Sequence, residues 1–309
     1  MKYASAALLG LFLASAFTPA NASKGIPGNA DHRFAQLETL LPTAGTTRTA
    51  SGAPGAQYWQ QRADYRIKVT LDEKRHRLIA SQSITYMNRS PDTLSYIWLQ
   101  LDQNIFKDDS IARRSEVAAN SGTRRDSVGK GDSLSFAAMR RHQAFQDRKY
   151  GYDIGQVRDA SGRVLRTTVN DTMMRIDLPQ PLRPGTSIEI RFDWESNIVN
   201  EAAIGARGGY EYFEGSDTYQ YFLAQWFPRL VAYTDYTGWQ HKQFLGRGEF
   251  TLEFGDYDVE LTVPADHIVA STGELQNADA VLTATQRERL KRAATAKSPV
   301  FIVTPEEAK

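Results

Sequence analysis

The feature that limits the fold most is a strict alternation of apolar and polar side chains. It is clearest at residues 65–72 and 187–194, where large apolar residues occupy every second position between charged or hydroxyl residues. Successive side chains of a strand point to opposite faces, so this pattern predicts strands with one face in a core and the other in water. Such strands belong mostly to antiparallel sheets, and we therefore expect a mainly β fold.

Other segments carry shorter strand signals. The Asn, Pro and Asp of residues 88–92 favour a turn between two strands, which predicts an antiparallel meander. Apolar alternation on both sides of residues 255–256 predicts a hairpin or two adjacent strands. The remaining expected strands lie around residue 157 and at 78–86, 94–101, 164–169, 174–178 and, as a buried strand, 300–303.

Helical signals are few. Thr283 and Gln286 fit a capping box and predict one C-terminal helix over 283–296. Phe34, Leu37 and Leu41 recur at helical spacing and predict a short N-terminal helix. A weaker helical stretch at 134–145 lies within a polar segment, residues 107–149. We interpret that segment as a solvated insertion without a site, rather than as a phosphate-binding or partner-docking arm.

The N-terminus indicates export. Lys2 precedes an apolar run at residues 6–17, and an A-x-A pattern ends at Ala22, as in a secretory signal peptide covering residues 1–22. The run is too short to span a bilayer. Cleavage near Ala22/Ser23 predicts a periplasmic or secreted protein with no transmembrane anchor. Residues 23–59 are then expected to form a tether with its short helix, and residues 60–309 the β domain.

Composition excludes several classes of function. The chain has no cysteine, which excludes disulfides and zinc sites built on thiolates. Its 37 basic and 36 acidic side chains create no overall field that would attract nucleic acid. Small molecules, peptides and protein partners remain as ligands.

Local catalytic motifs are absent from the sequence. A zinc hydrolase usually carries two histidines one helical turn apart beside a glutamate, and no two histidines of this chain are so close. There is no G-x-S-x-G nucleophile motif, no P-loop and no G-x-G-x-x-G after a strand. We therefore assign no catalytic residue and no metal ligand. The five histidines are His32, His76, His142, His241 and His267.

Residues 219–258 are much richer in Tyr, Phe and Trp than the 11% average of the chain. Gln225, Arg229, Asp235 and His241 are interleaved with these aromatic residues. A mixture of this kind is typical either of a packed seam in a core or of one wall of a binding cleft. The pattern leaves both interpretations open.

Several motifs within residues 60–305 resemble, in the same order, the N-terminal β domain of gluzincin zinc aminopeptidases. This is the peptidase family that includes aminopeptidase N and leukotriene hydrolase, and the resemblance is strongest to its bacterial secreted branch. The motifs are Tyr86-Met87-Asn88, Pro91-Asp92-Thr93-Leu94, Gln225-Trp226-Phe227-Pro228-Arg229, Tyr233-Thr234-Asp235, Gly238-Trp239, Gly248-Glu249-Phe250, Tyr257-Asp258-Val259, Val263-Pro264-Ala265 and Ala270-Ser271-Thr272-Gly273-Glu274-Leu275.

The resemblance implies a saddle-like antiparallel β sandwich that packs beside a thermolysin-like catalytic domain. In the family, the zinc motif H-E-x-x-H and the G-x-M-E-N motif for the substrate amine belong to that second domain, and neither occurs in these residues. The resemblance thus implies a chain truncated before the catalytic domain. Such a chain is expected to be inactive alone, with zinc and peptide substrate bound by the full-length protein.

One substrate-binding residue follows from the resemblance. Family members place a Gln or Glu of the β domain at the wall of the first substrate pocket, and Gln225 is the matching position. The other interpretation is that Gln225 caps a strand end or bonds to backbone. Arg229 is interpreted as an ion-pair partner, and Trp226, Phe227 and Trp239 as core residues. At residues 228–233 the sequence departs from the family's Pro-Cys-Phe-Asp-Glu-Pro pattern, which weakens residue-level transfer.

A second class of function remains open from the sequence. The chain is alternatively a free-standing periplasmic β-sandwich module that binds a peptide or carbohydrate through its aromatic residues. The coding sequence after Lys309 distinguishes the two hypotheses. A continuing frame with H-E-x-x-H supports the aminopeptidase domain, and a stop codon supports the binding module.

Overall fold

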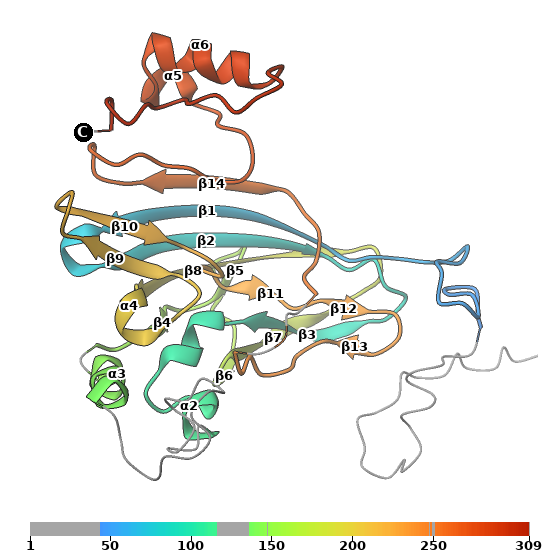
Figure 1. The fold of residues 1–309 in the computed structure, drawn as a ribbon. Coiled ribbons are helices and arrows are strands. Elements are labelled where there is room, and N and C mark those ends of the chain that lie inside the picture. Colours follow the sequence, from blue (N-terminus) through green and yellow to red (C-terminus); the bar gives the residue numbers. More distant parts are fainter. Residues whose placement is uncertain (1–43, 116–135, 147, 247, 249–250, 309) are drawn as a thin grey trace, which may run out of the picture.

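The computed structural model describes residues 44–115, 136–146, 148–246, 248 and 251–308. Within them, two β-sheets pack together and enclose one main core (Figure 1). The predicted mainly β fold is confirmed. The expected signal peptide and the expected helix around residues 34–41 lie outside the described residues.

The first sheet contains the longest strands. Its neighbouring strands pair antiparallel except at one edge, where the outermost strand runs parallel to its neighbour with Tyr65 opposite Tyr257. In order across the sheet, the strands are β14 (Tyr257–Thr262), β1 (Arg62–Asp72), β2 (Arg77–Met87), β8 (Ser187–Asn197) and β4 (Gly151–Ile154), with the short β5 (Arg158–Asp159) also paired to β8.

The second sheet is antiparallel throughout. Its order is β11 (Arg229–Leu230), β3 (Leu94–Gln100), β7 (Met173–Leu182) and β6 (Thr167–Asn170). Two small two-stranded sheets complete the β structure: β9 (Gly209–Phe213) with β10 (Thr218–Phe222), and β12 (Tyr233–Thr234) with β13 (Gly238–Trp239).

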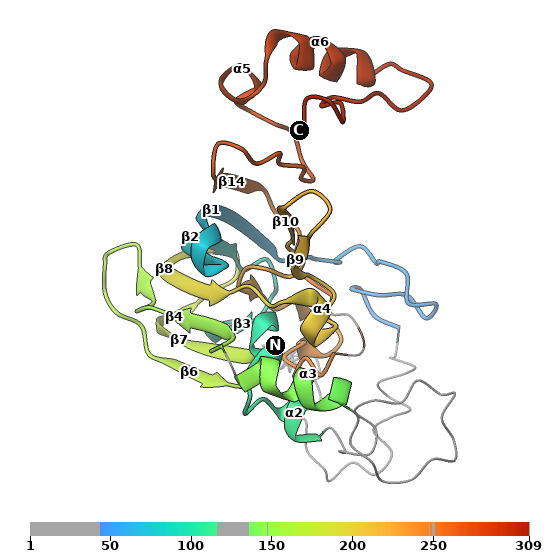
Figure 2. The same cartoon turned by 60° about the vertical axis from the view of Figure 1, so that its left-hand side comes forward.

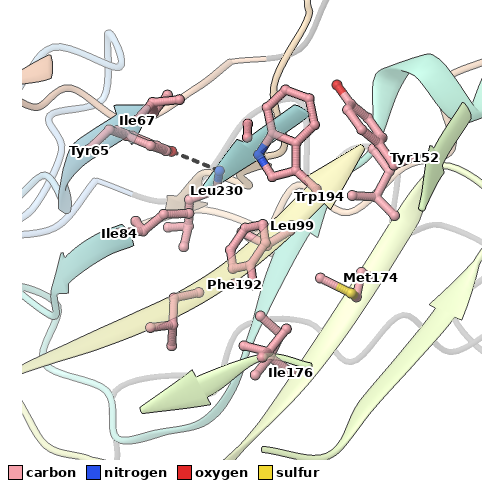
Figure 3. Close-up of a cluster of buried hydrophobic side chains, with 14 of the residues drawn as sticks. Tyr65, Ile67, Ile84, Leu99, Tyr152, Met174, Ile176, Phe192, Trp194 and Leu230 are labelled. Carbon is pink, nitrogen blue, oxygen red and sulfur yellow. Dashed lines mark hydrogen bonds between the residues drawn. The ribbon is translucent and has the colours of Figure 1, made fainter. Parts of the chain in front are cut away.

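The core forms from the residues that the alternation places on the inner faces. Tyr65 and Ile67 of β1 and Phe192 and Trp194 of β8 are buried, and Figure 3 shows them gathered with side chains of the second sheet. Burial of each large apolar side chain stabilises the fold by about 1.5–3 kcal/mol. The backbone N–H of Leu230 on β11 donates a 2.8 Å hydrogen bond to the Tyr65 hydroxyl, which ties the two sheets together.

The described helices are short and lie outside the sheets. Figures 1 and 2 place α5 and α6 beyond β14, and α2, α3 and α4 on the other side of the sandwich. None of the helices in the described ranges has the length and apolar character needed to cross a membrane. Their bounds are α2 (Ile111–Ser115), α3 (Phe136–Gln146), α4 (Glu201–Ile204), α5 (Ala278–Val281) and α6 (Ala284–Ala293), with the 3₁₀ turns η1 (Glu73–Arg75) and η2 (Asp102–Phe106).

The predicted C-terminal helix is confirmed together with its capping box. The Thr283 hydroxyl accepts a hydrogen bond from the backbone N–H of Gln286, and the Gln286 side chain accepts one from the backbone N–H of Thr283. The helix is α6, and the one-turn helix α5 precedes it. The helical signal at 134–145 corresponds to α3.

The predicted meander of β1, β2 and β3 is wrong beyond its first pair. β2 pairs with β8, whereas β3 lies in the other sheet between β11 and β7. The 88–92 turn therefore carries the chain from one sheet to the other. The Asn88 side chain stabilises this crossing, because its amide donates to the backbone carbonyls of Asp92 and Leu182.

The expected pairing of the segments around residues 255–256 is also wrong. Phe254 and β14 both lie along β1 rather than against each other. Gly255 explains this arrangement, because a Cβ atom there would lie 1.7 Å from the backbone oxygen of Ala63. Glycine is needed for the close approach to β1, and it forms no hairpin turn.

The buried strand expected at 300–303 is wrong as well. The segment has no strand structure, and Phe301 is 70% exposed. The carbonyl of Ile302 accepts a hydrogen bond from the Arg289 side chain of α6. Its backbone is thus held by a side chain, and an apolar run without a partner strand does not form a sheet.

A carboxyl group lies where the segment before β14 crosses the sandwich. Glu253 accepts a 2.7 Å hydrogen bond from the backbone N–H of Tyr233. Burial raises the pKa of the Glu253 carboxyl to about 7, although this hydrogen bond favours the charged form. The folded protein therefore binds a proton here at pH values where the unfolded chain has released it.

We expect this group to make stability pH-dependent. The contribution of the protonated Glu253 carboxyl to the free energy of unfolding is fully present below the unfolded pKa of 4.5. It is lost as the pH rises toward the folded pKa of about 7. Glu253→Gln keeps an acceptor for Tyr233 and removes the titration. The variant should match wild type near pH 4.5 and exceed it at pH 8 by on the order of 2 kcal/mol in unfolding free energy from urea denaturation. An equal difference at both pH values would contradict this assignment.

Candidate functional site

The segment from Ala224 to Arg229 links β10 to β11 and contains the one predicted site residue. Gln225 has φ 52°, in the left-handed region that non-glycine residues seldom occupy. Such a conformation persists only where surrounding contacts hold it, and these residues are often found at functional sites. At Gln225 the backbone is therefore held in a conformation that a non-glycine residue does not favour by itself.

Two side chains fix the backbone at this point. The Gln103 side-chain amide donates to the carbonyl of Ala224 at 3.2 Å and to the carbonyl of Gln225 at 3.0 Å. The Tyr152 hydroxyl donates to the same Gln225 carbonyl at 3.2 Å. The carbonyl on each side of the Gln225 Cα atom is thus held from η2, and one is also held from β4.

A buried ion pair holds the other end of the segment. The Arg229 guanidinium donates two hydrogen bonds, of 3.0 and 2.7 Å, to one carboxylate oxygen of Asp102, and the Gln100 amide donates to the other oxygen at 2.7 Å. The Asp102 side chain is 1% exposed. Burial raises the pKa of Asp102, while Arg229 and Gln100 favour the charged form. The interpretation of Arg229 as an ion-pair partner agrees with this geometry.

The aromatic residues of the segment pack on the core. Trp226 lies 6.1 Å from the ring of Trp194, and Phe227 contacts Tyr65 at 5.8 Å and Tyr257 at 6.1 Å. Trp194 and Tyr65 belong to the main core, and Trp226 and Phe227 pack against it as partly buried residues. Trp239 likewise packs against the core, so the sequence interpretation of these aromatic residues as core is confirmed.

The Gln225 side chain differs from its neighbours. It is partly buried, and among the described residues its amide forms no hydrogen bond, since all the bonds at this residue involve the backbone carbonyl. Strand capping by this side chain is therefore not seen. A hollow of about 20 Å³, enough for one water molecule, is bordered by Gln103, Phe222, Leu223, Ala224 and Trp226, and Gln225 is not among the residues that line it.

The other polar residues of the aromatic stretch lie elsewhere. Asp235 is bound by Arg48 of the N-terminal segment, with a 2.9 Å bond from the guanidinium. His241 stacks on Trp98 with ring centroids 5.0 Å apart. The structure therefore does not bring Asp235 or His241 together with Gln225.

The described residues do not fit a zinc ion. His76 stacks on Tyr210, His241 stacks on Trp98, and the ring of His267 lies 6.0 Å from the ring of Tyr221. Across the described ranges, no three His, Asp or Glu side chains are grouped so that they could hold a metal ion.

Sequence reasoning missed the residues that hold the segment. Asp102, Gln103 and Asn104 are consecutive in η2, and Asn104 accepts a 2.9 Å bond from the backbone N–H of Tyr152. One signal was available: three polar residues directly follow an apolar strand and precede Ile105 and Phe106. Polar residues enclosed by apolar runs are often buried and hydrogen-bonded.

No protein-family model matches the chain, and no curated protein matches it. Among solved structures, an M1 zinc metallopeptidase from Deinococcus radiodurans bound to a Tyr-Ser-Ala substrate is similar at 14% identity and a TM-score of 0.35, over 70% of this chain and 35% of that one.

Two further structures give similar values. A second structure of an M1 zinc metallopeptidase from Deinococcus radiodurans has 14% identity and a TM-score of 0.34, over 72% of this chain and 36% of that one. A two-domain M1 zinc metallopeptidase bound to L-tryptophan has 14% identity and a TM-score of 0.33, over 72% and 39%. The chain spans little more than a third of the length of these structures.

We expect the Asp102–Arg229 pair to be essential for stability. Arg229→Met leaves a buried carboxylate without its guanidinium and should cost about 3–5 kcal/mol of unfolding free energy. The matched control is Arg166→Met, because Arg166 pairs with Asp177 at 2.7 Å but is 81% exposed. This change should cost less than about 1 kcal/mol. Equal losses in urea denaturation would show that burial of the pair has no special effect.

Proposed function

We propose that this chain is the substrate-facing, non-catalytic β domain of a zinc aminopeptidase that removes N-terminal residues from peptides. One observation carries the proposal. Gln225 is held in a left-handed conformation by Gln103 and Tyr152, while its own side-chain amide stays available. This is the position that the sequence resemblance assigns to the wall of the first substrate pocket.

An available amide suits the recognition of a peptide N-terminus. Its Oε1 atom accepts hydrogen bonds from an α-ammonium group, and its Nε2 atom donates to a carbonyl. A hydrogen bond to a charged group is stronger than one between neutral groups. Because the backbone of Gln225 is already fixed, little conformational entropy is lost when a substrate binds.

In this proposal the reaction belongs to a second domain. Zinc bound there would polarise the scissile carbonyl and activate water. The chain of 309 residues contains no H-E-x-x-H sequence. Residues of this chain would hold the substrate, and alone they would hydrolyse nothing. Export to the periplasm or beyond, directed by residues 1–22, is part of the same proposal.

The exposed face of β14 suits the docking of that domain. Tyr257 is 47% exposed, and Val259 and Leu261 are each 39% exposed. They lie in register with the buried side chains of β1, so they extend the core face beyond the area that the second sheet covers. Phe227 contacts Tyr257 and connects this apolar strip to the Gln225 segment. A domain packed on β14 would therefore also lie close to Gln225.

One observation favours the alternative of a free-standing binding module. Tyr210 and Tyr212 of β9 stand opposite Tyr221 and Tyr219 of β10, which places all of them on one face of the hairpin. Tyr212 and Tyr219 are more than 40% exposed. Aromatic faces of this kind bind sugars and peptides. A stop codon directly after Lys309 would favour this function, and a continuing frame with H-E-x-x-H would favour the aminopeptidase.

We expect Gln225→Ala in the zinc-containing protein to lower kcat/KM for aminoacyl p-nitroanilides by about 10- to 100-fold, the effect of losing one charge-assisted hydrogen bond. The control is Gln220→Ala, an exposed glutamine on β10. Steady-state kinetics should show no change in that variant. Equal kcat/KM in wild type and Gln225→Ala would remove Gln225 from the substrate site.

The 309-residue chain alone should hydrolyse no aminoacyl p-nitroanilide and should contain no stoichiometric zinc by metal analysis. Both follow from the sequence, which lacks the zinc motif of this enzyme class. Turnover together with one zinc per chain would overturn the proposal that this chain binds substrate while a second domain carries out the reaction.

The apolar strip of β14 should make the isolated chain associate or bind a hydrophobic dye. Val259→Lys should reduce both, as measured by light scattering and dye fluorescence. Val169→Lys is the control, because Val169 is a 50% exposed valine on β6 of the other sheet. Equal effects of the two substitutions would mean that β14 is not the surface responsible for association and dye binding.

A further inference from the structure

We infer that Gln103 is a positioning residue, whose side chain holds Gln225 in the orientation that presents its amide to substrate. This inference rests on the proposed function for the role of Gln225. The structural part of it, control of the Gln225 backbone by Gln103, can be tested on the 309-residue chain itself.

The geometry of the two hydrogen bonds supports this role. The Nε2 atom of Gln103 donates to the carbonyls of both Ala224 and Gln225, the two peptide groups that flank the Cα atom of Gln225. Fixing both peptide planes restricts the φ and ψ angles of the residue between them. By holding both peptide groups, Gln103 favours the left-handed conformation, which only a few per cent of non-glycine residues adopt, while the Tyr152 hydroxyl supports one of the two carbonyls.

The neighbours of Gln103 keep its own position fixed. Asp102 is tied to Arg229, and the Asn104 side chain donates to the carbonyl of Asp171 at 2.7 Å. The Asn104 side-chain oxygen accepts a hydrogen bond from the backbone N–H of Tyr152, whose hydroxyl donates to the Gln225 carbonyl. Three consecutive side chains of η2 therefore hold the Ala224–Arg229 segment in place, Asp102 and Gln103 directly and Asn104 through Tyr152.

The role of Gln103 differs from that of a core residue. Its side chain is only partly buried, and its hydrogen bonds end on the backbone around one residue. Gln103 touches the Gln225 backbone and leaves the Gln225 amide free. Loss of Gln103 should consequently change the orientation of that amide more than it changes the sandwich.

The first test measures the backbone of residue 225 in the 309-residue chain. The three-bond HN–Hα coupling and the Cα and Cβ chemical shifts report the φ angle by nuclear magnetic resonance. In Gln103→Ala, residue 225 should leave the left-handed region. In the double variant Gln103→Ala, Gln225→Gly it should stay there, as read from the Cα shift and the two HN–Hα couplings of Gly at this position, because glycine adopts positive φ without help. A left-handed Gln225 in Gln103→Ala would overturn the inference.

The second test uses the zinc-containing protein and a panel of aminoacyl p-nitroanilides. Gln103→Ala should lower kcat/KM about tenfold and alter the ratios between substrates in the same direction as Gln225→Ala. In a Gln225→Ala background it should have almost no further effect. Independent, multiplied losses would overturn the inference, while no effect of Gln225→Ala would instead overturn the proposed function.

A destabilised control separates positioning from folding. Ile190→Val removes one methylene from the buried part of β8, far along the chain from η2. Such a variant lowers the folded fraction equally for every substrate and leaves the ratios unchanged. Gln103→Ala could instead lower kcat/KM by one common factor for all substrates, as this control does. In that case the role of Gln103 is structural only and the inference fails.

Discussion

The buried ion pair between Asp102 and Arg229 is the interaction on which the described architecture depends most directly. Asp102 begins η2 at the end of β3, and Arg229 begins β11, which pairs with β3. The pair therefore fixes the edge of the second sheet and the end of the Gln225 segment at once. Breaking a buried pair leaves a charge without compensation, so the two residues must be kept or lost together.

The polar turn η2 gives the sandwich a local rigidity that apolar packing alone does not supply. Apolar contacts are not directional, so they bury Trp226 and Phe227 without setting the angle of the residue beside them. Hydrogen bonds from Gln103 and Tyr152 are directional, and they set the Gln225 backbone. A functional side chain on a loop is precise only when contacts of this second kind support it.

The sequence predicted the periodic parts of the fold and little of what connects them. The alternation identified β1 and β8, and the Thr283 capping box identified α6, because these signals lie within a few residues of one another. The placement of β3 in the second sheet and the parallel pairing of β14 with β1 depend on contacts between residues far apart in the chain. Gln225 was reached only through resemblance, and no periodic signal marks the residues of η2 that hold it.

The partly exposed face of β14 contacts the Ala224–Arg229 segment through Phe227, which packs on Tyr257 and lies two residues after Gln225. A partner that covers Tyr257 and Val259 removes apolar surface from water, which gives association its driving force. The same partner would exclude water from the neighbourhood of Gln225. Hydrogen bonds are stronger in a dry environment of low dielectric constant, and an unsatisfied amide there costs more. Under the proposed function, docking would thus increase both the affinity of Gln225 for a matching peptide group and its discrimination against ligands that lack one.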